Sequence, residues 1–160
     1  MGLTREQPPV AATPAPPTRV RPVVLATLSV RVDPSAERMA IDSSLEAGAP
    51  LILVNLLPLR NYPTTIALLG AGATTLPHEE DLEAVRATAA RAAELGIKTE
   101  LLRVTTKRPV PALLEVLHER DAGLVVLGPD LSRTSRRRFR SVARRMRTEA
   151  DCLVWVAPDG

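Results

Sequence analysis

The chain has 160 residues, which is enough for one domain with a hydrophobic core and too few for two. Hydrophobic residues make up 45% of the sequence and charged residues 24%, as in soluble globular proteins, while aromatic residues make up only 2%. So low an aromatic content argues against nucleic-acid binders that stack bases on exposed rings. The formal net charge is +3, but eight arginines lie between residues 133 and 147 with no acidic residue among them. The positive charge is therefore concentrated in one segment.

The sequence contains one cysteine, Cys152, which cannot form a disulfide within the chain and fits a reducing compartment. It begins an apolar run, so a buried and unreactive thiol is expected. No apolar stretch approaches the ~20 residues that span a bilayer, and the amino terminus lacks the charged-then-apolar pattern of a secretory signal. The sequence therefore predicts a cytoplasmic protein that does not associate with membranes.

Residues 1–19 are rich in proline, alanine and threonine and show no apolar periodicity. This composition predicts an extended tail without a fixed fold. A solvated leader is the simpler interpretation of the tail, and a proline-rich ligand for a partner domain is the alternative. The folded domain is expected to cover residues 20–158.

Apolar runs and helix signals alternate through this domain. Residues 20–28 predict a first strand, and Asp33 then supplies a capping side chain for a helix that begins with proline and ends at Gly48. Residues 51–57 are almost continuously apolar, as strands buried on both faces of a parallel sheet are. Residues 58–76 are broken by prolines and glycines and form a long loop, which fits either a lid over a pocket or a variable excursion.

The second half of the domain continues the alternation. Acidic residues at 79–81 suit the start of a helix that Gly96 ends, and Pro109 or Pro111 starts the next helix. Further strands are expected at residues 97–104, 124–127 and 153–156. The pattern predicts an α/β fold: a single-domain, open, five-stranded parallel sheet with helices on both faces.

Two stretches near the carboxyl terminus follow the pattern of a known family. Asp121-Ala-Gly-Leu-Val-Val-Leu-Gly128 is similar to Ala-Asp-Leu-Ile-Val-Met-Gly, and Ala150-Asp-Cys-Leu-Val-Trp-Val156 is similar to Ala-Pro-Cys-Pro-Val-Leu-Val. Together with the first strand, the break after the second strand and a last helix beginning at Arg140, they make residues 20–158 resemble the universal stress protein family. The resemblance implies an adenine-nucleotide alpha-hydrolase-like sheet and a role in stress response or regulation.

The nucleotide motif of this family is only partly present. Its nucleotide-binding members carry Gly-x-x-Gly, a spacer, and then Gly-Ser or Gly-Thr, so that backbone amides and one hydroxyl reach the phosphates. Gly128 matches the first glycine, but Leu131 and Arg140 stand at the second and third, and Ser141 and Val142 match after them. A Cβ at the two changed positions penalises conformations with positive φ by ~1–2 kcal/mol per residue. The resemblance therefore implies a degenerate nucleotide site.

Two other family positions bear on the same site. The aspartate that follows the first strand in nucleotide-binding members is missing, and the nearest candidates are Leu28, Ser29 and Asp33. The position beside the adenine corresponds to Leu56, where contact is largely through the backbone. We therefore expect no firmly bound cofactor. The alternative is a functional site for ATP or another adenine nucleotide, with arginines such as Arg140 on the phosphates.

The arginine-rich segment has an apolar stripe at helical spacing, formed by Phe139, Val142, Ala143 and Met146. The arginines that fall outside this stripe are Arg138, Arg144, Arg145 and Arg147. A solvated basic face is the simplest interpretation. Binding of a polyanion such as nucleic acid is less favoured but open, because clustered arginines could neutralise several phosphates. An acidic protein partner is the other alternative.

The last strand consists of Leu153, Val154, Trp155 and Val156 and carries no charge. Universal stress proteins commonly dimerise through their last strands, so the resemblance implies a homodimer formed there. A short, uncharged edge strand suits pairing with a second copy.

The sequence contains no motif that predicts catalysis. It has no Gly-x-Ser-x-Gly and no phosphate-binding P-loop. His78 and His118 lie far apart, without the spacing of metal ligands. We therefore expect no metal site and no enzymatic activity beyond, at most, slow hydrolysis of a bound ATP.

Overall fold

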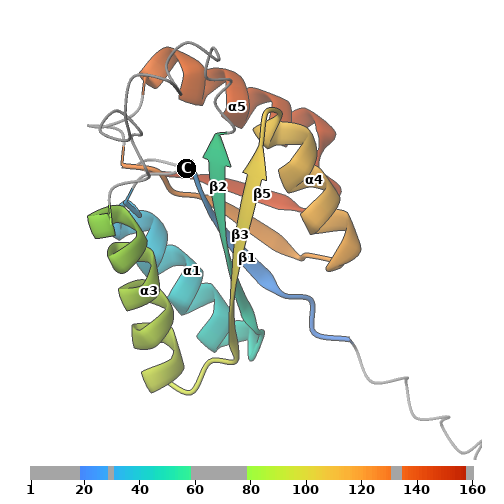
Figure 1. Ribbon diagram of the computed structural model, residues 1–160. Helices are drawn as coiled ribbons and strands as arrows, with labels where there is room; N and C mark the ends of the chain where they lie inside the picture. Colours follow the sequence, from blue (N-terminus) through green and yellow to red (C-terminus); the bar gives the residue numbers. More distant parts are fainter. Residues whose placement is uncertain (1–18, 29–30, 59–78, 131–134, 158–160) are drawn as a thin grey trace, which may run out of the picture.

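The computed structural model describes residues 19–28, 31–58, 79–130 and 135–157. Five parallel strands form one sheet in the order β3-β2-β1-β4-β5 (Figure 1). The strands are β1 (Val23–Thr27), β2 (Leu51–Pro58), β3 (Thr99–Thr106), β4 (Leu124–Leu127) and β5 (Leu153–Val156). The helices are α1 (Pro34–Ala47), α3 (Glu79–Glu94), α4 (Pro109–Glu119) and α5 (Arg136–Glu149). The predicted open α/β sheet is confirmed.

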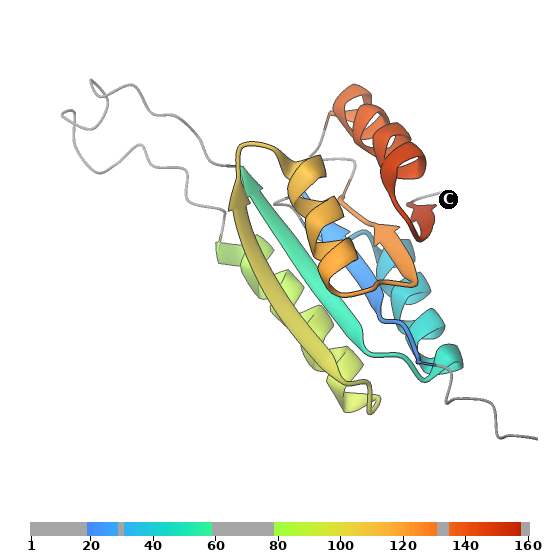
Figure 2. The same cartoon turned by 90° about the vertical axis from the view of Figure 1, so that its right-hand side faces the viewer.

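The sheet lies between two layers of helices. In Figure 2, α4 and α5 lie in front of the sheet, and α1 and α3 lie behind it. Each layer encloses its own core, because successive strand residues point to opposite faces. All residues of the central strand β1 are buried, whereas β3 lies at one edge of the sheet and alternates between partly buried and exposed side chains.

Helix α1 begins and ends where the sequence predicts. The Asp33 carboxylate accepts a hydrogen bond from the Ser35 N–H at 2.8 Å, and Pro34 occupies the first helical position. At the other end, Gly48 adopts the left-handed conformation with φ of 59° and its N–H caps the last turn. The Asp33 cap and the glycine at the end of the helix depend only on nearby residues, so both can be predicted from the sequence.

Three predicted boundaries are wrong by a few residues. The first strand starts at Val23 rather than at residue 20, since Pro22 has no N–H to donate to a ladder. The third strand starts at Thr99, because the Ile97 N–H still closes the end of α3 by bonding the Ala92 carbonyl at 3.1 Å. The last helix begins at Arg136 rather than Arg140, because the side chain of residue 135 caps an earlier turn.

Several predictions lie outside the described residues. They concern residues 1–18 of the tail, residues 59–76 of the long loop, Ser29, His78 and Leu131. None of the described helices combines the length and apolar character needed to cross a bilayer.

Candidate functional site

The strand order changes direction between β1 and β4. From β1 the chain moves through β2 to β3, and after α4 it returns to the other side of β1 to form β4 and β5 (Figure 1). In open parallel sheets, ligands bind outside the carboxyl ends of the strands at such a switch point. The loop after β1 and the segment after β4 meet there, so this is the candidate site.

The loop after β1 and the segment after β4 are joined to each other by backbone hydrogen bonds. The Asp33 N–H donates to the Gly128 carbonyl at 2.9 Å, and the Asp130 N–H donates to the Arg31 carbonyl at 2.9 Å. An isolated antiparallel bridge lies between these two bonds. The two connections therefore form a short two-stranded cover over the ends of β1 and β4.

This arrangement uses every backbone N–H of residues 128–130. The Gly128 N–H donates to the Ala26 carbonyl at 3.0 Å, and the Asp130 N–H donates to the Arg31 carbonyl. Pro129 has no N–H. An N–H that already donates to a carbonyl is not available to a phosphate oxygen. Residues 128–130 thus offer no free backbone donor to an anion.

Gly128 has a structural role that the sequence did not reveal. A Cβ placed there would lie 2.3 Å from the Cβ of Ala36 in α1 and 3.2 Å from Cδ1 of Leu25. Ala36 is fully buried, and Gly128 does not adopt a positive φ. Space for α1, rather than an unusual backbone conformation, therefore requires glycine at this position.

The other residues predicted for the site lie in two environments. Leu56 and Val142 are buried in the core between the sheet and the layer of α4 and α5. Arg140 and Ser141 are exposed on α5. Because α5 begins at Arg136, the Ser141 N–H lies beyond the first turn and is bonded within the helix. The assignment of these residues to a nucleotide stays a prediction.

Two interactions near the switch point were missed from the sequence. Thr27, the last residue of β1, pairs in register with Asn55 inside β2, and the Thr27 hydroxyl donates to Asn55 Oδ1 at 3.1 Å in a buried setting. The Arg31 guanidinium reaches Glu80 at 3.1 Å and so links the loop after β1 to α3. For the bond between Thr27 and Asn55, the sequence signal is one polar residue in each of two apolar strand runs.

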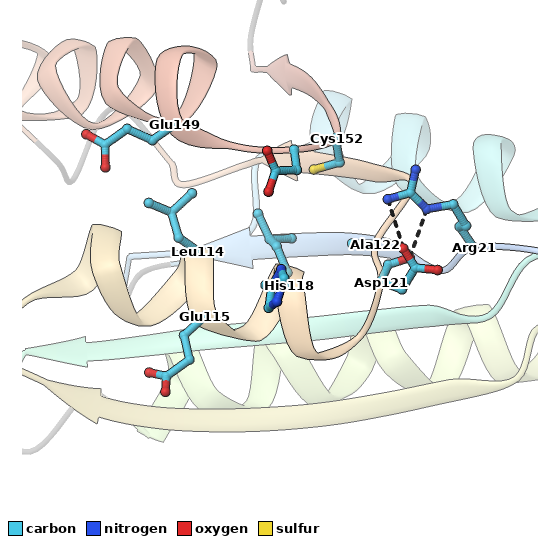
Figure 3. A pocket seen from close by; sticks show the side chains of 10 residues that line it. Arg21, Leu114, Glu115, His118, Asp121, Ala122, Glu149 and Cys152 are labelled. Carbon is cyan, nitrogen blue, oxygen red and sulfur yellow. Dashed lines mark hydrogen bonds and ion pairs between the residues drawn. The ribbon is translucent and has the colours of Figure 1, made fainter.

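A groove of about 400 Å³ lies between α4 and α5 at the opposite, amino-terminal side of the sheet (Figure 3). Its lining includes Leu114, Glu115, His118, Glu149, Asp151 and Cys152. An ion pair of 3.0 Å between Arg21 and Asp121 closes one end. Within the described ranges, no three His, Cys, Asp or Glu side chains are placed to hold a metal ion.

Burial raises the pKa of the half-buried Cys152 thiol, and this effect outweighs the opposing effect of the nearby Arg21 guanidinium. A raised pKa leaves less thiolate at a given pH, so the thiol is a weak nucleophile. The thiol is only half-buried rather than buried as the sequence predicts, and its low reactivity stays a prediction.

The comparison with known proteins agrees with this geometry. The family model of the universal stress protein family matches residues 20–158. A universal stress protein family member from Burkholderia pseudomallei is similar in structure, with a TM-score of 0.60, 22% identity, and coverage of 89% of this chain and 99% of that one. No curated protein sequence matches this chain.

Two further solved structures share the fold. The universal stress protein of Archaeoglobus fulgidus in complex with dAMP has a TM-score of 0.53 and 24% identity, and covers 85% of this chain and 96% of its own. A universal stress protein in complex with cAMP has a TM-score of 0.57 and 20% identity, with coverage of 88% and 99%. The class is thus an open parallel α/β sheet with its switch point between β1 and β4. The chain belongs to the universal stress protein family.

The contact between Gly128 and Ala36 can be tested by a double-mutant cycle. Gly128→Ala should destabilise the protein by about 1–3 kcal/mol, because the Cβ of Ala36 cannot move away without shifting α1. Ala36→Gly should cost roughly 1 kcal/mol alone, but much of the Gly128→Ala cost should disappear when the two changes are combined. Urea unfolding followed by the fluorescence of Trp155 measures the free energy of unfolding of all three variants.

The matched control is Ala40→Gly, also buried in α1, whose destabilisation should add to that of Gly128→Ala. Additive costs for Ala36→Gly would refute the assigned role.

The state of the Cys152 thiol gives a second prediction. The pH midpoint of its alkylation by iodoacetamide should lie higher in the native protein than in the same protein unfolded in urea, because burial raises the pKa. Arg21→Gln should raise the native midpoint further, since the guanidinium favours the thiolate. Arg38→Gln, an exposed change on α1, should leave it unchanged. A native midpoint at or below that of the unfolded chain would contradict the burial effect.

Proposed function

We propose that this chain is a regulatory binding module in stress response, that it acts as a homodimer, and that its nucleotide site is degenerate. Membership of the family supports a site at the switch point, because relatives have been solved with dAMP and with cAMP. The observation that carries the proposal is the hydrogen bonding of residues 128–130, whose backbone donors are all bound to protein carbonyls. We assign the chain a binding role rather than a catalytic one.

The expected loss of nucleotide affinity can be calculated from the hydrogen bonds that a phosphate group could not form here. A hydrogen bond to a charged group contributes about 1.5–3 kcal/mol, so two lost bonds weaken binding by at least about a hundredfold. Freeing the Asp33 and Asp130 N–H groups would require breaking the pairing of the two connections. The cover over β1 and β4 therefore competes with a nucleotide.

A second candidate function keeps the nucleotide. The first turn of α5 contains three consecutive arginines, starting at Arg136, and no acidic residue. Their guanidinium groups could replace backbone amides through charge-assisted, bidentate contacts to phosphates. In this alternative, ATP or another adenine nucleotide binds over the end of β4, and any hydrolysis is slow.

The two candidates differ in nucleotide affinity. We expect protein purified without added nucleotide to release no ATP, ADP or AMP on denaturation. Calorimetric titration with ATP should give a Kd weaker than about 1 mM, because the donors of residues 128–130 are occupied. Co-purified nucleotide, or micromolar binding that Arg136→Gln/Arg137→Gln/Arg138→Gln abolishes, would instead establish the second candidate. Micromolar binding that survives this change would reject both explanations.

The exposed edge of β5 supports the homodimer. The strand ends the sheet, and an edge strand presents unpaired backbone donors and acceptors. Leu153 is 74% exposed, Val154 and Trp155 are partly buried, and the strand carries no charge. Pairing with the same strand of a second copy would cover these groups and close the assembly at two chains.

This edge can be tested by one substitution. Leu153→Lys should convert the dimer to a monomer, since a lysine on an edge strand opposes strand pairing and an exposed leucine contributes little to the monomer fold. Sedimentation equilibrium measures the mass, and circular dichroism confirms the fold. The control is Leu95→Lys, which changes an equally apolar side chain that is 55% exposed near the end of α3. A wild-type monomer, or a dimer that survives Leu153→Lys, would exclude pairing through β5.

A further inference from the structure

The outer surface of α5 is strongly basic. The helix has 14 residues, and its arginines are Arg136, Arg137, Arg138, Arg140, Arg144, Arg145 and Arg147. Its apolar side chains are all buried beneath it, and its only acidic residue is Glu149 at the last position. The exposed part of α5 therefore consists of arginine and a few hydroxyl groups.

Five of these arginines form what we call the arginine ridge: Arg136, Arg137, Arg140, Arg144 and Arg147. At 3.6 residues per turn they share an arc of about 100° on one flank of the helix, next to the buried stripe. The positions 136, 140, 144 and 147 follow one another along the helix in steps of four, four and three residues. At 1.5 Å per residue the ridge is about 16 Å long. All five side chains are exposed.

Among the described residues, the arginine ridge has no ion pair, whereas five other arginines of the fold are paired. Ion pairs join Arg21 to Asp121, Arg31 to Glu80, Arg91 to Glu37 and Arg120 to Glu100. On α5, Arg145 pairs with Glu149 at 3.0 Å. Within the described part of the chain, no acidic side chain pairs with a ridge arginine. The ridge thus keeps its full charge available to a ligand.

The ridge also opposes the stability of its own helix. Like charges four residues apart repel one another, as Arg140 does with both Arg136 and Arg144. Arginines in the first turn lie at the positive end of the helix dipole, which favours acidic residues instead. A bound polyanion would relieve both repulsions, so charge complementarity points to an anionic partner.

We propose that the arginine ridge binds the phosphodiester backbone of nucleic acid without reading its sequence. A straight row of cations suits a regular row of phosphates, and guanidinium groups bind phosphate in a bidentate manner. Membrane insertion is disfavoured because α5 exposes no apolar side chain. Base stacking is disfavoured because the one aromatic residue of α5, Phe139, is buried. The ridge shares Arg136, Arg137 and Arg140 with the arginines considered for the nucleotide, but its binding of a phosphodiester backbone does not require a functional nucleotide site.

The test is duplex binding as a function of salt. For five neutralised phosphates, the slope of log K against log salt concentration should be about −4.5. Fluorescence anisotropy with two labelled 20-base-pair DNAs of unrelated sequence measures it, and both should bind equally. Arg140→Gln/Arg144→Gln should reduce the magnitude of the slope by about 2 while preserving the helix, since glutamine is a good helix former.

A matched control separates the ridge from the overall charge. Arg38→Gln/Arg103→Gln removes the same charge from exposed positions on α1 and β3, and its slope and affinity should equal those of the wild type. Equal losses in the two double variants would show that only net charge matters, and would overturn the proposal. It would also be overturned by the absence of duplex binding at 50 mM salt, or by binding confined to vesicles that contain phosphatidylserine.

Discussion

The close approach of α1 to the end of β4 determines the shape of the candidate site. It is possible only because residue 128 has no side chain, which lets Ala36 pack where a Cβ would otherwise lie. With α1 held there, the loop that precedes it reaches the segment after β4, and the two exchange the backbone bonds of Asp33 and Asp130. The packing of α1 and the hydrogen bonding of residues 128–130 are thus both linked to this one contact. A glycine that suggests a phosphate site can equally serve the packing of two elements.

Much of the fold could be predicted because its signals are local or periodic. Asp33 and Gly48 bound α1 through contacts with residues two to four positions away, and the apolar runs correspond to the strands within a few residues. The family was also recognisable from two short stretches near the carboxyl terminus. The family pattern predicts that the last helix starts at Arg140, whereas the capping residue Ser135 sets its start at Arg136.

The site itself was less predictable because it depends on contacts between distant segments. The partner of Gly128, the pairing of the two connections and the buried bond between Thr27 and Asn55 all join different elements. No spacing in the sequence indicates them. The sequence shows that the arginines of α5 form a cluster. The helix boundaries are needed to see which of them form the ridge, and the position of Glu149 is needed to see that Arg145 forms an ion pair instead.

The two edges of the sheet differ in a way that bears on how large an assembly can grow. At the far edge, β3 carries exposed charge at Arg103, and its Glu100 is held by Arg120 of the neighbouring helix. Such charges deter another strand from adding there. A sheet that could pair at both edges would add copies head to tail and form fibres. If β5 pairs with a second copy as proposed, the charged edge at β3 would end growth of the sheet after that single pairing and so limit polymerisation.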